Sequence, residues 1–250
     1  MNSPAANRWT QIKQAIKSCV PSAIANKIFR VPAAPAQPQA NTVLIHIGKC
    51  GGSTLRTALE QIADTFPVQI VHVEKPIYNA DHSYIIVARG PISRVISAFN
   101  WRYKLVVTDG TQHDRFKGEL EVLRRYESLN TLAEALYDND GNPNQAAHND
   151  IRKIHHLRED ISFYLSELLQ QCQPEQITAV LMQENLNADI QRVFGVTAGE
   201  REKDNSKASA NTLSDQAEQN LRRFFRPDYE ALTLLHSWRL IEDTVFAALR

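Results

Sequence analysis

The chain has 250 residues, 43% of them hydrophobic, and its 28 Lys and Arg residues balance 28 Asp and Glu residues. This length and composition suit one well-buried α/β domain that needs no disulfide or metal for stability. A formal net charge of zero argues against a dedicated nucleic-acid binder. The three cysteines are too widely spaced for a disulfide framework or metal cluster, and no run approaches the roughly 20 apolar residues of a membrane span. We therefore expect a soluble, cytoplasmic protein with reduced cysteines.

The first 40 residues are expected to form an arm on a domain that spans residues 41–250. Within residues 8–20, apolar side chains recur at helical spacing opposite basic ones, which predicts a short amphipathic helix. The Pro- and Ala-rich segment 31–40 is typical of an extended linker. We favour a helix that docks loosely on the domain's own surface. The alternatives are a helix that binds weakly to a membrane surface or a protein partner, and an organelle transit peptide.

From residue 42 onward, short apolar strands alternate with helical patterns, which predicts a parallel sheet with right-handed crossovers. Strands are expected at Thr42–Ile47, Val68–Val73, Ser83–Ala88 and Ile177–Met182. Helices are expected at Thr54–Ala63, from Gly90-Pro91 onward, at about 114–138 and 149–172, at Asn185–Phe194, from Ser214 to Phe225 and from near Pro227. The expected fold is α/β in three layers, with a central parallel sheet of about four to five strands flanked by helices.

The first strand breaks into a glycine-rich turn that carries a lysine, and a helix follows directly. A helix N-terminus leaves backbone N–H groups unpaired and carries about half a positive charge, so it can hold a phosphate or sulfate group. The turn adds a full charge, a backbone without Cβ clashes and two hydroxyl donors, from Lys49, from Gly51 and Gly52, and from Ser53 and Thr54. The pattern therefore predicts an anion-binding loop.

The order of residues in this loop differs from that of the common nucleotide-binding loop. That loop places its lysine after the last glycine and follows it with a magnesium-binding hydroxyl. Here Lys49 precedes Gly51 and Gly52, and no aspartate that could hold the metal ends a later strand. A P-loop nucleotide kinase or phosphotransferase on this P-loop-like architecture is thus the weaker interpretation, and we expect no metal. A plain strand-to-helix turn is the other alternative.

A second candidate anion site follows the third strand. Ligands of open α/β sheets bind beyond the carboxyl ends of the strands, and Arg89 stands at this edge, where a guanidinium can bind a phosphate with two hydrogen bonds. Ser97 lies two helical turns further on and, like Ser93 and Arg94, is off the apolar stripe of its helix, so this face could complete a phosphate site. The alternative is that Arg89 pairs with a carboxylate and Arg94 lies on solvated surface.

Both segments resemble the sulfotransferases that use 3′-phosphoadenosine 5′-phosphosulfate (PAPS), particularly the branch that sulfates carbohydrates. His46-Ile-Gly-Lys-Cys-Gly-Gly-Ser-Thr54 is similar to that family's 5′-phosphosulfate loop, H-x-P-K-T-G-G-T-[ST]. Arg89-Gly-Pro-Ile-Ser-Arg-Val-Ile-Ser97 is similar to its 3′-phosphate motif, R-D-P-x-x-R-x-x-S. Residues 205–229 are similar to its C-terminal pattern, in which a loop that covers the cofactor precedes the final helices. Ser206 and Lys207 would contact PAPS from that loop.

The resemblance implies transfer of a sulfuryl group from PAPS to a hydroxyl or amine, with a glycan or another small molecule as the acceptor. Lys49 would serve the leaving oxygen and the sulfate oxygens, while Arg89 and Ser97 would hold the 3′-phosphate. The 5′-phosphate would be bound by the loop residues Cys50, Gly51, Gly52, Ser53 and Thr54. A degenerate relative that binds a nucleotide without catalysis is an alternative.

Three positions depart from the family motifs: Gly48 replaces Pro, Cys50 replaces Thr and Gly90 replaces Asp. Cys50 loses a hydroxyl donor but keeps its backbone N–H. A catalytic thiol is the alternative role for Cys50, because the helix N-terminus and Lys49 would lower its pKa. No base is evident beside it, so we expect a tolerated variant.

The general base is expected at the end of the second strand, where His72 and Glu74 lie on the same side if the strand continues through both. His72 is slightly favoured, because its ordinary pKa is close to neutral pH. A half-buried structural histidine is the alternative. Further along, a predicted helix carries a histidine-rich basic cluster that suits a basic rim for an acidic glycan better than a metal site, namely His148, Arg152, Lys153, His155, His156 and Arg158.

Overall fold

The computed structural model describes residues 41–64, 66–197 and 213–249. The expected helix at residues 8–20 and the proposed contacts of Ser206 and Lys207 lie outside these residues. The described part has an α/β fold with one parallel sheet, in the strand order β2-β1-β3-β4. Its strands are β1 (Thr42–His46), β2 (Gln69–Val71), β3 (Ser83–Ala88) and β4 (Ile177–Met182). The predicted fold class is confirmed.

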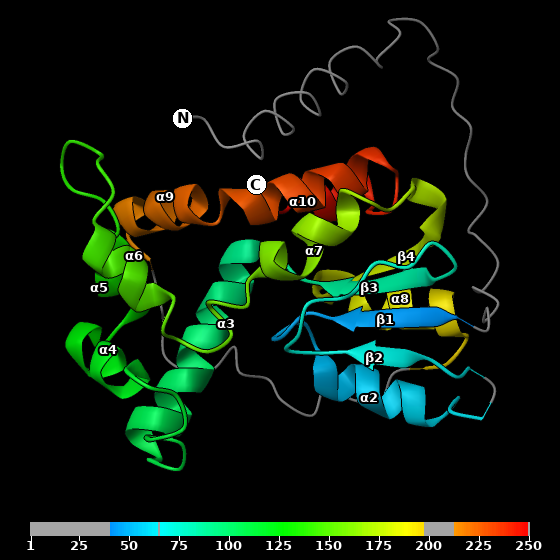
Figure 1. Ribbon diagram of the computed structural model, residues 1–250, viewed down its shortest axis with the longest axis horizontal. Coiled ribbons are helices and arrows are strands. Elements are labelled where there is room, and N and C mark those ends of the chain that lie inside the picture. Colours follow the sequence, from blue (N-terminus) through cyan, green and yellow to red (C-terminus); the bar gives the residue numbers. More distant parts are fainter. Residues whose placement is uncertain (1–40, 65, 198–212, 250) are drawn as a thin grey trace, which may run out of the picture. The chain divides into compact units, whose positions relative to one another are not determined.

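The sheet forms because its central strands are continuous apolar runs that both neighbours can bury. All six residues of β3 are buried, as is usual for parallel strands covered on both faces. Residue Val43 of β1 pairs with Gln69 on one side and with Tyr84 on the other. All carboxyl ends therefore meet at one edge, and Figure 1 shows α3 (Pro91–Tyr103) at that edge.

Helices cover the sheet and extend it into a second apolar cluster. Figure 1 shows α2 (Gly52–Glu60) beside β2, with α7 (Ile161–Leu169) and α10 (Arg226–Ser237) together on the other side of the strands. These helices share one hydrophobic cluster with the strands. The second cluster joins the buried face of α3 to further helices, and its contributors are α4 (Glu119–Tyr126), α5 (Leu129–Glu134), α6 (Gln145–Ile151) and α9 (Asp215–Phe224). The remaining helices are α8 (Leu186–Phe194) and α11 (Asp243–Ala247).

Two predicted helices are each divided in the structure, and the second strand is shorter than predicted; the other elements differ from their predicted bounds by at most three residues at an end. The pattern at 114–138 yields the two short helices α4 and α5, and the pattern at 149–172 yields α6 and α7 with a non-helical segment, 152–160, between them. Strand β2 ends at Val71, because Val73 has φ 63° and leaves the extended conformation. Among the helices described, none combines the length and apolarity that a membrane crossing requires.

Candidate anion site at the sheet edge

The predicted anion-binding loop connects β1 to α2 and has an unusual backbone. Lys49 has φ 72° and Gly51 has φ 88°, whereas Cys50 between them keeps a negative φ. Alternation of this kind turns successive N–H groups toward one side and forms a concave anion site. The first helical bond runs from the N–H of Leu55 to the Gly51 carbonyl, so the N–H groups of residues 52–54 have no partner within the helix. The loop thus has the backbone that phosphate binding requires.

Two cations converge on this loop from neighbouring strands. The Lys49 ammonium lies 4.5 Å from the ring centroid of Trp101 on α3, within the range of a cation–π interaction. Arg89 follows β3, and its Nη1 donates to the carbonyl of Lys49 at 3.4 Å. Its Nε donates to Ser93 Oγ at 3.0 Å. The half-buried guanidinium is therefore held beside the loop.

One face of α3 lines the same region. Ser93, Ser97 and Trp101 follow one another at intervals of four residues and so share one face of the helix. Ser93 contacts Arg89 and Trp101 contacts Lys49, so Ser97 lies on the face between these two cations. The structure thus brings the predicted residues Lys49, Arg89 and Ser97 to one site, and Trp101 joins them without having been predicted.

A carboxylate occupies the N-terminus of α3. Glu184 follows β4, and its Oε1 accepts a hydrogen bond from the N–H of Gly90 at 2.8 Å and one from Ser93 Oγ at 3.3 Å. A Cβ at position 90 would lie 3.1 Å from the same oxygen and 3.0 Å from Leu249 Cδ2. A side chain at position 90 would therefore require Leu249 or Glu184 to shift. An added phosphate would be repelled from this helix end and would bind nearer to Ser97.

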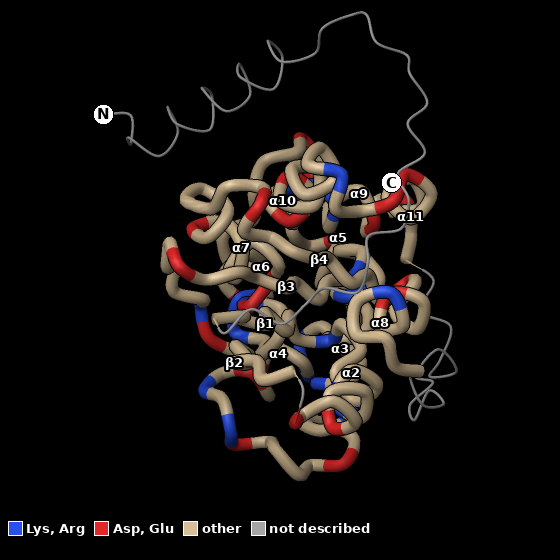
Figure 2. Tube along the Cα trace, turned by 90° about the vertical axis from the view of Figure 1, so that its right-hand side faces the viewer, with Lys and Arg blue, Asp and Glu red and all other residues tan. Residues whose placement is uncertain are grey.

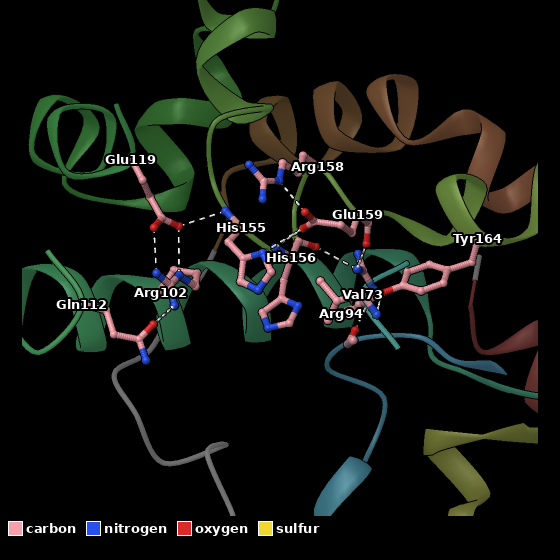
Figure 3. Close-up of polar contacts among 11 residues, drawn as sticks. Val73, Arg94, Arg102, Gln112, Glu119, His155, His156, Arg158, Glu159 and Tyr164 are labelled. Atoms are coloured by element: carbon pink, nitrogen blue, oxygen red, sulfur yellow. Dashed lines mark hydrogen bonds and ion pairs between the residues drawn. The ribbon is translucent and has the colours of Figure 1, made fainter. Parts of the chain in front are cut away.

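Arg94 is fully buried, and this overturns the alternative of a solvated surface arginine. Its Nε donates to the Gly48 carbonyl at 3.0 Å, and its Nη2 donates to the carbonyls of His156 at 2.8 Å and of Glu159. Figure 3 shows the guanidinium between these groups. Arg94 therefore does not face the expected phosphate, but it anchors the start of the anion loop to the segment 152–160.

Position 48 is a glycine because a histidine ring fills the space beside it. A Cβ on Gly48 would lie 2.6 Å from His156 Nδ1, which is closer than a real contact allows. Burial, His155 and the cations Lys49 and Arg94 together lower the pKa of His156 to about 2. The ring beside the loop is therefore neutral at physiological pH, and the loss of the family's proline at this position has a structural cause.

Arg152, Lys153 and Arg158 of the expected basic rim are exposed, and the rim stays a prediction. His155 and His156 do not lie on a helix as expected; His155 is buried and His156 is half-buried. Their ring centroids are 4.0 Å apart. Together with Glu159 they offer three ligand atoms within 4.8 Å of one another, so they could in principle hold a metal ion. However, the carboxylate already accepts hydrogen bonds from the His156 N–H and from Arg158, and Arg94 donates to the backbone carbonyl of Glu159 (Figure 3). We assign these residues a structural role.

Cys50 turns its side chain into the apolar core rather than toward the anion. The residue is fully buried, and its Sγ lies 3.7 Å from the Gly48 carbonyl. Burial raises the pKa of the thiol to about 12, which outweighs the opposite effects of Arg94 and Arg89. The catalytic-thiol alternative is therefore wrong, because the reactive thiolate would be almost absent at neutral pH. Only the backbone N–H of Cys50 could contribute to anion binding.

His72 and Glu74 do not share one side of a strand, since β2 ends before both. The His72 Nδ1 donates to the carbonyl of His46 at 2.9 Å, so this nitrogen carries a proton. In the neutral ring the lone pair then belongs to Nε2, which can accept a proton. His72 also stacks on His46, with centroids 4.5 Å apart. His72 and Glu74 are both exposed. The choice of base between these two residues stays a prediction.

Neither the protein-family models, nor the curated proteins, nor the solved structures yield a match to this chain. Function is therefore inferred from the site itself.

Several residues of the site gave no signal in the sequence. Trp101 lies 52 positions from Lys49, His156 lies 108 positions from Gly48, and Glu184 lies 94 positions from Gly90. No local motif connects residues that are this far apart in the chain. Trp101 alone carried a hint, because it continues the four-residue spacing of Ser93 and Ser97. That spacing alone places Trp101 on the same face of α3 as the two serines.

Proposed function

We propose that this protein is a sulfotransferase that moves a sulfuryl group from PAPS to a hydroxyl or amine acceptor. The observation that carries the proposal is the meeting of two anion anchors at one sheet edge. Arg89 Nη1 lies 3.4 Å from the carbonyl of Lys49, and Ser97 shares the helix face that lies between the two side chains. A donor with a 5′-phosphosulfate and a 3′-phosphate matches such a pair, whereas a donor with one phosphate chain does not need the second anchor.

Each role follows from the chemistry of sulfuryl transfer. The bond between sulfur and the bridging oxygen breaks, so negative charge develops on that oxygen, where Lys49 and the loop N–H groups can stabilise it. The acceptor oxygen attacks the sulfur and releases a proton, which His72 Nε2 can take. Because a sulfuryl group carries less charge than a phosphoryl group, a lysine and backbone donors suffice without a metal.

The test is calorimetry with adenosine 3′,5′-bisphosphate. Arg89→Ala should lose about 2 kcal/mol of binding free energy, or about thirtyfold in affinity, since a charged hydrogen-bonded contact is removed. Arg124→Ala provides the matched control, because Arg124 is an exposed arginine on α4. Equal affinity in all three proteins, or binding and turnover of ATP with magnesium in preference, would contradict the proposal and favour a phosphotransferase.

A further inference from the structure

A large cavity lies on the β2 side of the anion loop. Its volume is about 840 Å³, which is within the usual range of small-molecule sites. It follows α2 and the residues after it as far as Ala63, and it runs along β1 to Asn41, the residue before that strand. The cavity is therefore a groove along the edge of the sheet, with one end at the loop.

The groove meets the proposed donor site at the anion loop, where Gly52 and Ser53 belong to both, and does not extend to Arg89. Its loop end is formed by His46, Gly52, Ser53 and His72, so it opens onto the anion loop and the proposed base. Arg89 and α3 do not line it. Since β1 lies between β2 and β3, the groove and Arg89 are on opposite sides of the loop.

The lining of the groove is mainly apolar, with Leu55, Leu59, Phe66, Pro67, Val68 and Ile70 as the main contributors. Among the described residues that line it, the charged ones are Arg56 and Glu60, whose formal charges cancel. Burial and the neighbouring His72 lower the pKa of His46 to about 4, so this ring adds no charge at neutral pH. Figure 2 shows acidic and basic residues interspersed along the described Cα trace. The lining residues that the structure describes suit an uncharged apolar molecule.

We propose that this groove binds the acceptor, and that the acceptor is a hydroxyl group carried on an uncharged apolar body, such as a substituted phenol. This inference rests on the proposed sulfotransferase function. It differs from the glycan that the sequence resemblance implies, because the part of the groove wall that the structure describes offers a polyanionic glycan one arginine beside one glutamate.

The transfer step balances as follows. The acceptor oxygen forms a bond to the sulfur of PAPS, and the bond from sulfur to the phosphate oxygen breaks with its electron pair left on that oxygen. The hydroxyl proton passes to His72 Nε2 and then to solvent. The products are the sulfate ester and adenosine 3′,5′-bisphosphate, and no oxidant, reductant or metal is consumed.

The test uses 2-naphthol as a fluorescent apolar acceptor and compares two exposed isoleucines in the full chain. Ile70 is 51% exposed and lines the groove, whereas Ile77 is 87% exposed and does not. Ile70→Glu should weaken 2-naphthol binding about tenfold or more, because a charge replaces an apolar contact. Ile77→Glu should leave it unchanged. Ile70→Ser, which adds no charge, should weaken binding to a smaller extent and guards against misfolding of the glutamate variant.

The outcomes separate the two proposals. If the protein binds adenosine 3′,5′-bisphosphate but not 2-naphthol, or if it sulfates a chondroitin oligosaccharide faster than 2-naphthol, the acceptor inference is wrong while the sulfotransferase proposal stands. If the bisphosphate does not bind, the proposed function fails, and the acceptor role of the groove fails with it. Sulfation of 2-naphthol that Ile70→Glu reduces and Ile77→Glu preserves would support both.

Discussion

The contact between Gly48 and His156 can be tested by a double-mutant cycle. A Cβ at position 48 would lie 2.6 Å from His156 Nδ1 and 3.1 Å from Cε1, so an alanine requires the ring or the loop to move. The ring cannot move freely, because Arg94 binds the His156 carbonyl and Glu159 binds its N–H. Overpacking of a buried site costs about 1–3 kcal/mol, so Gly48→Ala should lower the free energy of unfolding by about 2 kcal/mol.

Removal of the ring should abolish this cost. His156→Gly suits the second arm of the cycle, since position 156 has φ 67° and glycine adopts it without strain. In that background Gly48→Ala meets open space. It also restricts the unfolded chain, so its effect should be neutral or stabilising by up to about 1 kcal/mol. The expected coupling energy between the two positions is therefore about 2 kcal/mol or more.

Urea denaturation of all four proteins, followed by circular dichroism, measures this coupling. Calorimetry with adenosine 3′,5′-bisphosphate on the same proteins tests whether the loop keeps its binding geometry, which should be restored in the double variant. Additive effects, with a coupling below about 0.5 kcal/mol, would refute the reasoning, because residues in contact do not behave independently.

Further predictions concern the chemistry and the pH dependence. Lys49→Ala should lower the rate of sulfuryl transfer by about 10²-fold or more, since it removes a charge from the leaving oxygen, while the exposed Lys117→Ala should retain the full rate in the same assay. In initial-rate measurements His72→Gln should lose about 10²-fold, whereas Glu74→Gln should stay within about twofold; the reverse order would assign the base to Glu74. The pKa of His156 is lowered from 6.5 to about 2 on folding, so only the unfolded chain takes up this proton as the pH falls below 6.5. In urea denaturation, the free energy of unfolding of the wild type relative to that of His156→Asn should therefore fall by about 2 kcal/mol as the pH is lowered from about 7.5 to about 5. A difference that does not change with pH would contradict a buried neutral ring.

Elements with strong local signals could be predicted from the sequence. Strands β3 and β4 have their predicted bounds because each is an uninterrupted apolar run that the sheet buries. Helix α3 begins at Pro91 after Gly90, as the preference for proline at the first helical position indicates. Ser214 caps α9 by accepting a hydrogen bond from the N–H of Ala217. These signals depend only on residues close in the chain.

The parts that could not be predicted depend on contacts between distant residues. The segment 152–160 has the composition of a helix, but Arg94, 62 positions away from His156, binds its carbonyl and holds the backbone in another conformation. Strand β2 ends early where the N–H of Val73 donates to the hydroxyl of Tyr164, 91 positions further on. Sequence periodicity carries no information about such partners, so tertiary contacts overrode the local preference in both places.

Gly48 and Gly90 are the two glycines that differ from the motifs of the family that the chain resembles, and each has a distant residue beside it. The His156 ring lies where a side chain at position 48 would lie, and the Glu184 carboxylate lies close to where a side chain at position 90 would begin. The two replacements differ in effect. The neutral His156 ring leaves the positive potential of Lys49 intact, whereas the Glu184 carboxylate occupies the N-terminus of α3. If the protein binds PAPS as proposed, the 3′-phosphate would therefore bind at Arg89 and the Ser97 face of α3, and the acceptor would approach from the β2 side of the loop.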